Sequence, residues 1–342
     1  MTLGGNIRLL FFLCFALLLS CNSVDKNEVT SFYYEINGSA QGTTFSIIYQ
    51  DTLSKDFSLA IDSLLKEIDL QLSTYDSSSL ISQINSSNKN SHLVDGYDLF
   101  IECFNRSKYF HKKTNGYFNA AIFPLVEYWG FNKINDVQID TNFILNSIIP
   151  LIQMDSIYFV KNNNGSTNIF KSNTDSKLDF NAIAQGYSVD LVAEFFKFNG
   201  VDNFMVEIGG EVRTRGVNSK GTTWRIGIER PVEDSFIGEN GFQKIISLQN
   251  KSLATSGNYR KYKMFNGEKV SHTLNPLTGF AVNSNLLSVS VITEYAADAD
   301  ALSTSFMVMG LNKSIEFLKK DTSIKAYFIY DSIGEYKEWS NF

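Results

Sequence analysis

The chain has 342 residues, of which 44% are hydrophobic and 14% are aromatic, so it is long and apolar enough to bury a large core. This composition excludes a chain that is disordered throughout. The formal net charge is −6 and the sequence has no basic cluster, which makes nucleic acid and anionic lipid poor candidate partners.

The N-terminal segment has the pattern of an export signal. Arg8 precedes an apolar run from Leu9 to Leu19, and Ser20 and Cys21 follow it. A membrane-spanning helix needs roughly 20 apolar residues, so this shorter run favours a cleaved signal over a permanent anchor. The stretch LLSC resembles the bacterial lipobox, in which the cysteine receives the lipid and becomes the new N-terminus. An ordinary signal peptide with a chance cysteine is the alternative.

This pattern predicts three segments. Residues 1–20 are expected to be a lipoprotein signal peptide, residues 21–31 a polar spacer that starts with lipidated Cys21, and residues 32–342 the folded unit. The mature chain would carry a net charge of about −7 and face the periplasm, anchored by lipid to a membrane of the bacterial cell envelope. Cys103 would be the one thiol left, so no intramolecular disulfide could form, and we expect it in the core.

The apolar periodicity predicts elements in the following order. Helices are expected over 57–72, 98–112, 182–198 and 298–309, and strands over TTFSIIY, NFMVEI, EVRTRG, WRIGIE, KIISL, LLSVSVI and AYFIY. NFMVEI and EVRTRG should meet at Gly209 and Gly210, and KNNNGSTN should form a hairpin tip. Blocks of helices and antiparallel strands predict an α+β fold in one compact unit or two closely joined subdomains.

The familiar signatures of nucleotide and zinc sites are missing from the sequence. It contains no GxxxxGK[ST] loop and no GxGxxG after a strand. It also lacks HExxH and paired CxxC motifs, and its three histidines are scattered. Oxygen ligands remain as the way to hold a metal ion.

The stretch ADADALST, from Ala297 to Thr304, is the first candidate site. Residues four apart share a helix face, so Asp300 and Thr304 can present a carboxylate and a hydroxyl together. These oxygen groups suit Mg²⁺. Alternatively, Asp298 and Asp300 stabilise the helix start as an N-cap and a first-turn acid.

Four further stretches carry polar residues next to turns or helix starts. In SHTLNPLTGFAV, His272 precedes a turn, and in LDFNAIAQGYSVD, Asp179 precedes a helix whose small residues allow close approach of a ligand. LATSGNYRKY and MVEIGGEVRTRG each read as a hairpin when taken alone. A structural role is the alternative for every one of them.

Together these stretches resemble the ApbE family of flavin transferases, which move FMN from FAD onto a threonine or serine of another protein. The resemblance runs from about Gly38 to Leu318. The matching stretches are GSAQGTTFSIIY, LSTYDSSSLISQIN, TNGYFNAAIFPLVEYWGF, LDFNAIAQGYSVD, VEIGGEVRTRG, LATSGNYRKY, SHTLNPLTGF and ADADALST. It implies an ApbE-like, T-fold-like arrangement of mixed helices and antiparallel sheets.

The resemblance also implies roles for individual residues. Asp300, Thr304 and the backbone carbonyl of Ala182 would be the magnesium ligands, and His272 would be the catalytic base. The flavin and adenine contacts would fall on Gln41, Tyr75, Tyr117, Phe118, Asn119, Asp179, Gln185 and Thr273. Mg²⁺ would be the cofactor and FAD the substrate. The partner would be an acceptor protein with a Thr/Ser flavinylation motif, such as a redox-pump subunit.

Three positions depart from the family pattern. Gln41 replaces a methionine, Gln185 replaces a common lysine and Asn119 replaces a common aspartate. The two glutamines can still hydrogen-bond a purine or a phosphate, but a neutral Gln185 loses charge attraction, so we expect altered FAD affinity. Asn119 keeps the size and loses the charge, and capping a turn before Pro124 is an equal alternative for it.

The sequence therefore indicates a membrane-tethered, Mg²⁺-dependent FAD:protein FMN transferase that releases AMP. A Mg²⁺-dependent FAD pyrophosphatase that yields FMN and AMP is the first alternative, because sequence does not separate water from a hydroxyl as the nucleophile. A non-catalytic flavin-binding lipoprotein is the second, and retention of Asp300, Thr304 and His272 argues against it.

Overall fold

The computed structural model describes residues 32–130, 139–231, 241–258, 262–265 and 268–342, with side chains left out over 262–269. The predicted signal peptide, the lipidation site at Cys21 and the spacer up to residue 31 lie outside the described residues. None of the described helices is long and apolar enough to cross a membrane.

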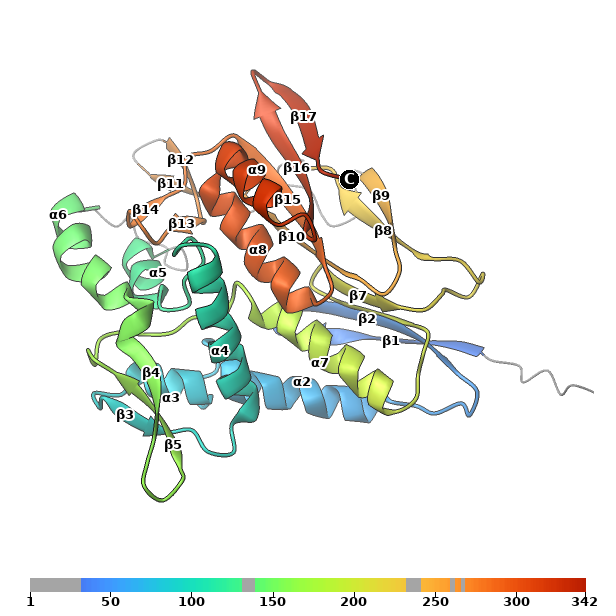
Figure 1. The fold of residues 1–342 in the computed structure, drawn as a ribbon, viewed down its shortest axis with the longest axis horizontal. Helices are drawn as coiled ribbons and strands as arrows, with labels where there is room; N and C mark the ends of the chain where they lie inside the picture. The colour runs from blue at the N-terminus through green and yellow to red at the C-terminus, as the bar shows by residue number, and fades with distance from the viewer. Residues whose placement is uncertain (1–31, 131–138, 232–240, 259–261, 266–267) are drawn as a thin grey trace, which may run out of the picture.

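An eight-stranded antiparallel sheet forms the centre of the molecule (Figure 1). Strands from the two ends of the chain complete it, so the sheet assembles only when distant segments meet. In spatial order its strands are β1 (Phe32–Ala40), β2 (Thr43–Asp51), β6 (Phe204–Ile208), β7 (Glu211–Arg215), β10 (Ser252–Gly257), β15 (Leu286–Thr293), β16 (Lys325–Ser332) and β17 (Glu335–Ser340).

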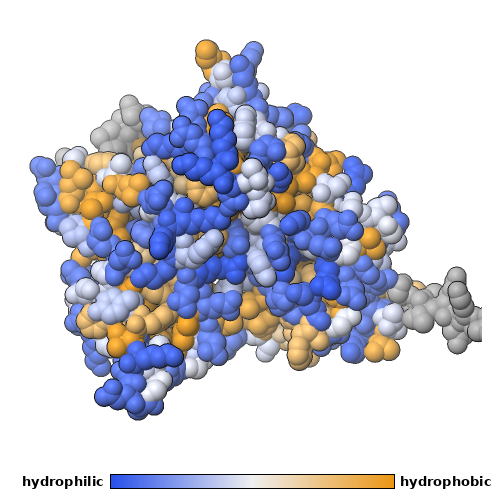
Figure 2. All heavy atoms as spheres, in the orientation of Figure 1, coloured by the Kyte–Doolittle hydropathy of each residue, from blue (hydrophilic) through white to orange (hydrophobic). Residues whose placement is uncertain are grey.

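Helices cover one face of this sheet and enclose the main core. Helices α7 and α8 pack against each other and against the central strands, and α8 is buried on nearly all sides because most of its residues are small or apolar. Figure 2 shows the outer side of this layer, where hydrophilic residues cover most of the surface between small apolar groups. The helices are α2 (Ser58–Leu72), α3 (Leu80–Ser86), α4 (Asp98–Lys113), α7 (Ala184–Phe198), α8 (Ala296–Met309) and α9 (Leu311–Lys320).

Two smaller apolar clusters lie outside the main core. The hairpin of β8 (Trp224–Glu229) and β9 (Phe242–Leu248) covers Leu253, Ile292 and Tyr327 on the opposite side of the sheet. The other cluster joins Leu274 to α5 (Phe123–Trp129) and to the irregular turns η1 (Ile144–Ile148) and η2 (Ile149–Ile152).

Short elements complete the described chain. They are β3 (Ser91–Leu93), α6 (Thr141–Phe143), η3 (Met154–Ser156), β4 (Ile157–Lys161), β5 (Thr167–Lys171), β11 (Tyr262–Phe265), β12 (Glu268–Ser271), β13 (Leu274–Asn275) and β14 (Phe280–Ala281).

The predicted α+β class is confirmed, as are the four helices and the predicted strands. Cys103 is fully buried, and the asparagine-rich stretch forms the turn between β4 and β5. Helix α8 begins at Ala296, two residues before the predicted start at Asp298. Asp298 therefore lies in the first turn and is not the N-cap. LATSG, which alone reads as a hairpin, is instead the central strand β10.

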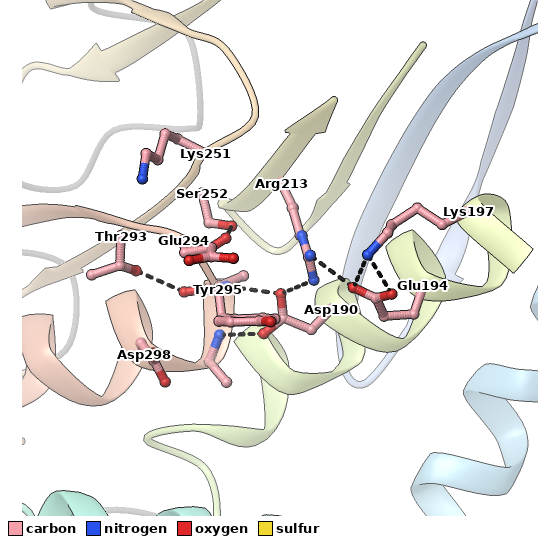
Figure 3. Close-up of polar contacts among 12 residues, drawn as sticks. Asp190, Glu194, Lys197, Arg213, Lys251, Ser252, Thr293, Glu294, Tyr295 and Asp298 are labelled. Carbon is pink, nitrogen blue, oxygen red and sulfur yellow. Dashed lines mark hydrogen bonds and ion pairs between the residues drawn. The ribbon is translucent and has the colours of Figure 1, made fainter. Parts of the chain in front are cut away.

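One buried carboxylate holds the start of α8 (Figure 3). Asp190 of α7 accepts hydrogen bonds from the N–H groups of Ala296 and Ala297, each at 2.9 Å. It also accepts one from the Arg213 guanidinium of β7 at 2.8 Å. Since the first amides of a helix lack partners within it, Asp190 supplies the cap that α8 has no side chain of its own to provide.

Arg213 has a second carboxylate partner and an aromatic one. Its guanidinium donates to Glu194 at 2.8 Å and lies 4.9 Å from the centre of the Tyr295 ring. Arg106 of α4 lies at the same distance from that ring and pairs with Asp298 at 2.6 Å. Asp298 therefore ties α8 to α4.

Replacing Arg213 by alanine is expected to lower the free energy of unfolding by roughly 3 kcal/mol, because it leaves the Asp190 carboxylate buried without its cation. Urea unfolding followed by circular dichroism measures this loss. Arg215→Ala is the matched control on the same strand, since its pair with Asp202 is exposed and is worth at most about 1 kcal/mol. Equal losses in the two variants would contradict the role given to Asp190.

Candidate active site

The candidate metal-binding residues lie where the start of α7 meets α8. Asp300 is 6% exposed, and its carboxylate accepts a hydrogen bond from the Gly186 N–H at 3.1 Å. A Cβ on Gly186 would lie 2.4 Å from the carbonyl oxygen of Ala296, so only glycine permits this close packing of the two helices. Ala182 lies in the turn immediately before α7.

Thr304 follows Asp300 by one helical turn. Its hydroxyl lies 3.1 Å from the Ser256 hydroxyl of β10, which is also 2.8 Å from the hydroxyl of Ser303. Asp300 and Thr304 thus share one side of α8, as their spacing predicted. Asp298 points elsewhere, to Arg106, so the structure separates the two acids of the motif.

Burial raises the pKa of the Asp300 carboxyl above its usual range, although the hydrogen bond from Gly186 acts in the opposite direction. The pKa of Glu211, at the start of β7, is raised further by its own burial and by the negative charge of Asp300. Two buried acids therefore lie close enough to affect each other electrostatically.

The donor set here fits a hard divalent cation. A carboxylate, a hydroxyl and a nearby turn that offers a carbonyl are the oxygen groups that Mg²⁺ prefers. Among the described residues, no three His, Cys, Asp or Glu side chains cluster as a metal site, so a cation at Asp300 would need further oxygens from elsewhere. The phosphates of a bound nucleotide are such oxygens.

Asp179 lies in the turn that leads into α7. Its N–H donates to the Ala120 carbonyl at 2.7 Å, and its carboxylate accepts from the Asn181 N–H at 2.8 Å. Burial raises the pKa of Asp179 to about 6. Tyr75, which is 77% exposed, has its hydroxyl at the Asn181 side chain, so this predicted contact residue does lie beside Asp179.

The two glutamines that depart from the family pattern lie at the start of α7, because Gln41 contacts this helix and Gln185 belongs to it. Gln41 lies in the tight turn between β1 and β2 with a positive φ of 54°, and its side-chain amide donates to the Ser188 hydroxyl at 2.6 Å. The Gln185 side chain occupies the space over Gly209, where a Cβ would lie 1.8 Å from its amide nitrogen. The structure thus brings together Gln41, Gln185 and the Gly186–Asp300 contact.

The stretch TNGYFN presents its predicted contact residues in different directions. The Tyr117 hydroxyl accepts a hydrogen bond from Lys313 at 2.7 Å. Phe118 is 2% exposed and packs on Phe110, so its ring belongs to the core. The Asn119 amide donates to the Ile152 carbonyl and its oxygen accepts the Ala121 N–H, both at 2.8 Å. These bonds stabilise the local turn, which is the alternative to a flavin contact for this residue.

His272 is half-buried between β12 and the hairpin of β13 and β14. The next residue, Thr273, donates its N–H to the Ser271 hydroxyl at 3.1 Å and accepts the Val282 N–H at 2.8 Å. The hairpin approaches TNGYFN closely, since a Cβ on Gly116 would lie 2.9 Å from the Leu277 side chain. A cleft of about 770 Å³ lies between α4, the TNGYFN stretch and Leu277, and its lining includes Asn119 but not His272, Asp300 or Thr304.

Sequence reasoning missed Glu211 and Ser256. Glu211 stands after the Gly-Gly pair at the start of a strand, and Ser256 lies in a stretch that reads as a turn. Glu211 could have been found because it is a charged residue at a strand position that the sheet buries, where charged residues are rare.

Comparison with known proteins places this chain in a family. Residues 41–328 match the model of the ApbE family, which is most of the chain, so the protein belongs to the ApbE family. A FAD:protein FMN transferase of Haemophilus influenzae is 31% identical over 301 residues, covering 86% of this chain and 85% of that protein. One of Vibrio cholerae is 30% identical over 311 residues, covering 90% of both.

Solved structures agree with the sequence relatives. The flavin transferase ApbE from Vibrio cholerae superposes with a TM-score of 0.78 at 28% identity, covering 91% of this chain and 97% of that one. The apo form of the Pseudomonas stutzeri flavinyl transferase ApbE gives the same TM-score and identity, with 91% and 95% covered. The predicted ApbE-like arrangement of helices and antiparallel sheets is therefore confirmed.

The raised pKa of Asp179 predicts a pH-dependent cost to stability. The folded state keeps this proton up to about pH 6, whereas the unfolded chain releases it near pH 4, so stability is lost as pH rises between these values. Asp179→Asn removes this loss and should be more stable than the wild type by up to roughly 3 kcal/mol at pH 7, with no gain below pH 4.

Urea unfolding at pH 4, 5, 6 and 7 in EDTA measures this difference. Asp175→Asn, an exposed acid in the same segment, is the control and should follow the wild type. A constant difference between Asp179→Asn and the wild type over this range would contradict the buried, protonated state.

Proposed function

We propose that this protein is a Mg²⁺-dependent FAD:protein FMN transferase that attaches FMN to a threonine or serine of an acceptor protein and releases AMP. The observation that carries this proposal is the buried Asp300 carboxylate on the Gly186 N–H, with Thr304 one turn away. This contact joins two separate sequence motifs in one oxygen-rich site at the start of a helix. The names of the relatives in the ApbE family support the reaction class.

The transfer requires an acceptor oxygen to attack the phosphorus on the flavin side of the FAD pyrophosphate. A bond forms from that oxygen to phosphorus, and the bond from phosphorus to the AMP oxygen breaks. Mg²⁺ held by Asp300, Thr304 and the Ala182 carbonyl would neutralise charge on the phosphate oxygens. The Asp190 cap holds α8 in place, so Asp300 and Thr304 are positioned before the substrate arrives.

The acceptor hydroxyl must lose its proton as the new bond forms. Its pKa is too high for ionisation at neutral pH, and we assign His272 as the base that takes the proton. The β13–β14 hairpin that follows His272 packs against a cluster separate from the main core, and Trp129 of that cluster donates to the Gly279 carbonyl at 3.0 Å. This anchoring limits the positions that the imidazole can take.

FAD would be held mainly by groups around the two helix starts. Tyr75, beside Asp179, offers an exposed ring for stacking, while Gln41 and Gln185 offer neutral amides. Thr273 and Tyr117 complete the polar set, and Phe118 and Asn119 act by shaping the loop. Without a cation at Gln185 the phosphates are held by hydrogen bonds and the metal ion, so FAD affinity should depend strongly on Mg²⁺.

The first experiment incubates the purified protein with FAD, Mg²⁺ and a candidate acceptor. Intact mass spectrometry should show the acceptor gaining the mass of one FMN residue, and chromatography should show equimolar AMP. AMP release without labelling of the acceptor would favour the pyrophosphatase. Neither product, with an acceptor that another ApbE-family transferase labels, would reject both activities.

Variants of the metal site provide the sharper comparison. Asp300→Ala and Thr304→Ala should each lower Mg²⁺-dependent turnover at least about a hundredfold while circular dichroism stays unchanged, since each removes an oxygen from the cation. Asp298→Ala is the matched control on the same helix, because Asp298 pairs with Arg106 instead. Full activity in Asp300→Ala would remove the metal assignment.

We also propose that the protein is lipid-anchored in the cell envelope and faces the periplasm, as the lipobox-like LLSC indicates. Cys21→Ser should move the protein from the membrane fraction to the soluble periplasmic fraction, and metabolic labelling with a radioactive fatty acid should be lost. Cys103→Ser keeps the lipid site and should remain labelled and in the membrane fraction. Labelling that persists in Cys21→Ser would overturn the assignment.

A further inference from the structure

Glu211 faces the helices from the strand beside the candidate metal site. It pairs with Ile208 across the β6–β7 hairpin, and directly opposed residues share a face of the sheet. Ile208 is part of the main core under the helices, so Glu211 lies on that side. Glu207 pairs with Val212 and faces the opposite side, where its carboxylate accepts the Gly210 N–H at 2.7 Å.

The Glu211 carboxylate is buried and incompletely satisfied. The residue is 6% exposed, and its Oε2 atom has no hydrogen-bond partner among the described protein groups. A buried charged oxygen without a partner costs several kcal/mol in general, so such an atom calls for a partner such as a water, a ligand or a bound ion. The charge of Asp300 adds to the cost, because the two acids repel each other.

The protein supplies no cation for this pair within its described residues. Arg213 lies two residues along the same face of β7, but its guanidinium is held by Asp190 and Glu194. A proton shared between the two acids would need a hydrogen bond, and Oε2 makes none to Asp300. A divalent cation satisfies both carboxylates at once, since its charge matches theirs.

We propose that Glu211 is a second carboxylate of the divalent-cation site formed by Asp300 and Thr304, with Oε2 facing the ion directly or through a water. The ligand is a hard cation of the Mg²⁺ type, which proteins commonly hold through one or two carboxylates together with substrate phosphates. The identity of the ion as Mg²⁺ rests on the proposed function, whereas the participation of Glu211 does not. Gln185 and Gly209 hold the hairpin close to α7 and so keep Glu211 beside the ion.

Manganese binding tests this without FAD or an acceptor. The purified full chain in detergent is titrated with Mn²⁺ alone, and free Mn²⁺ is measured by electron paramagnetic resonance. Glu211→Gln keeps the shape and removes the charge, and it should weaken binding by about 10-fold to 100-fold. Glu207→Gln, in the same hairpin but on the other face, should bind as the wild type does.

Thermal unfolding gives a second readout. In EDTA, Glu211→Gln should unfold at a temperature equal to or above that of the wild type, since a neutral amide of the same shape replaces a buried acid beside Asp300. The rise in unfolding temperature on adding Mg²⁺ should be smaller than in the wild type, because stabilisation by a ligand follows its affinity. If Glu211→Gln does not fold, Glu211→Asp replaces it, and its shorter carboxylate should also weaken Mn²⁺ binding.

An unchanged Mn²⁺ affinity in the folded Glu211 variant, or no Mn²⁺ binding by the wild type, would overturn the inference. The outcome is separable from that of the proposed function. Glu211-dependent Mn²⁺ binding without FMN transfer would reject the transferase and keep the cation site. FMN transfer with an unchanged affinity in Glu211→Gln would keep the transferase and reject the role of Glu211.

Discussion

The carboxylate of Asp190 is the interaction on which the rest of the site depends. By binding two backbone amides of α8 and the guanidinium of Arg213, it joins α7, α8 and β7 at one buried point. Asp300 follows Ala297 by about one turn of helix, so fixing Ala297 also fixes where Asp300 meets Gly186. The same contact sets the distance from α8 to β7, and therefore to Glu211.

Much of the fold could be predicted from local pattern, and the reason is physical. Helices α2, α4 and α7 each carry apolar residues at helical spacing, and the hairpin at Gly209 and Gly210 combines alternation with two residues suited to positive φ. The order of the sheet could not be predicted this way, because β2 pairs with β6, which follows it by almost half the length of the chain. Local periodicity contains no information on such distant partners.

In the candidate site, too, contacts within one element could be predicted and contacts between distant elements could not. The spacing of Asp300 and Thr304 was sufficient to place them together, since one helix contains both. The cap on α8 could not be foreseen, because Asp190 lies in a different helix and looks like any polar residue of an amphipathic pattern. For Phe118 and Asn119, similarity to a family assigned contact roles, whereas packing shows one ring in the core and one amide bound to its own turn. Neighbours in sequence here point in different directions.

The packing of the β13–β14 hairpin, which follows His272, bears on how the proposed activity would be lost on heating. Leu274 belongs to a small cluster with α5 and the turns η1 and η2, whereas Asp300 is surrounded by the main core. Regions with few buried apolar contacts open locally at a lower free energy than the global core. The proposed proton acceptor and the proposed cation ligands thus belong to apolar clusters of unequal size. If His272 is the base and Asp300 a cation ligand, as we propose, mild warming would displace His272 first and leave a folded protein that binds the cation without transferring the flavin.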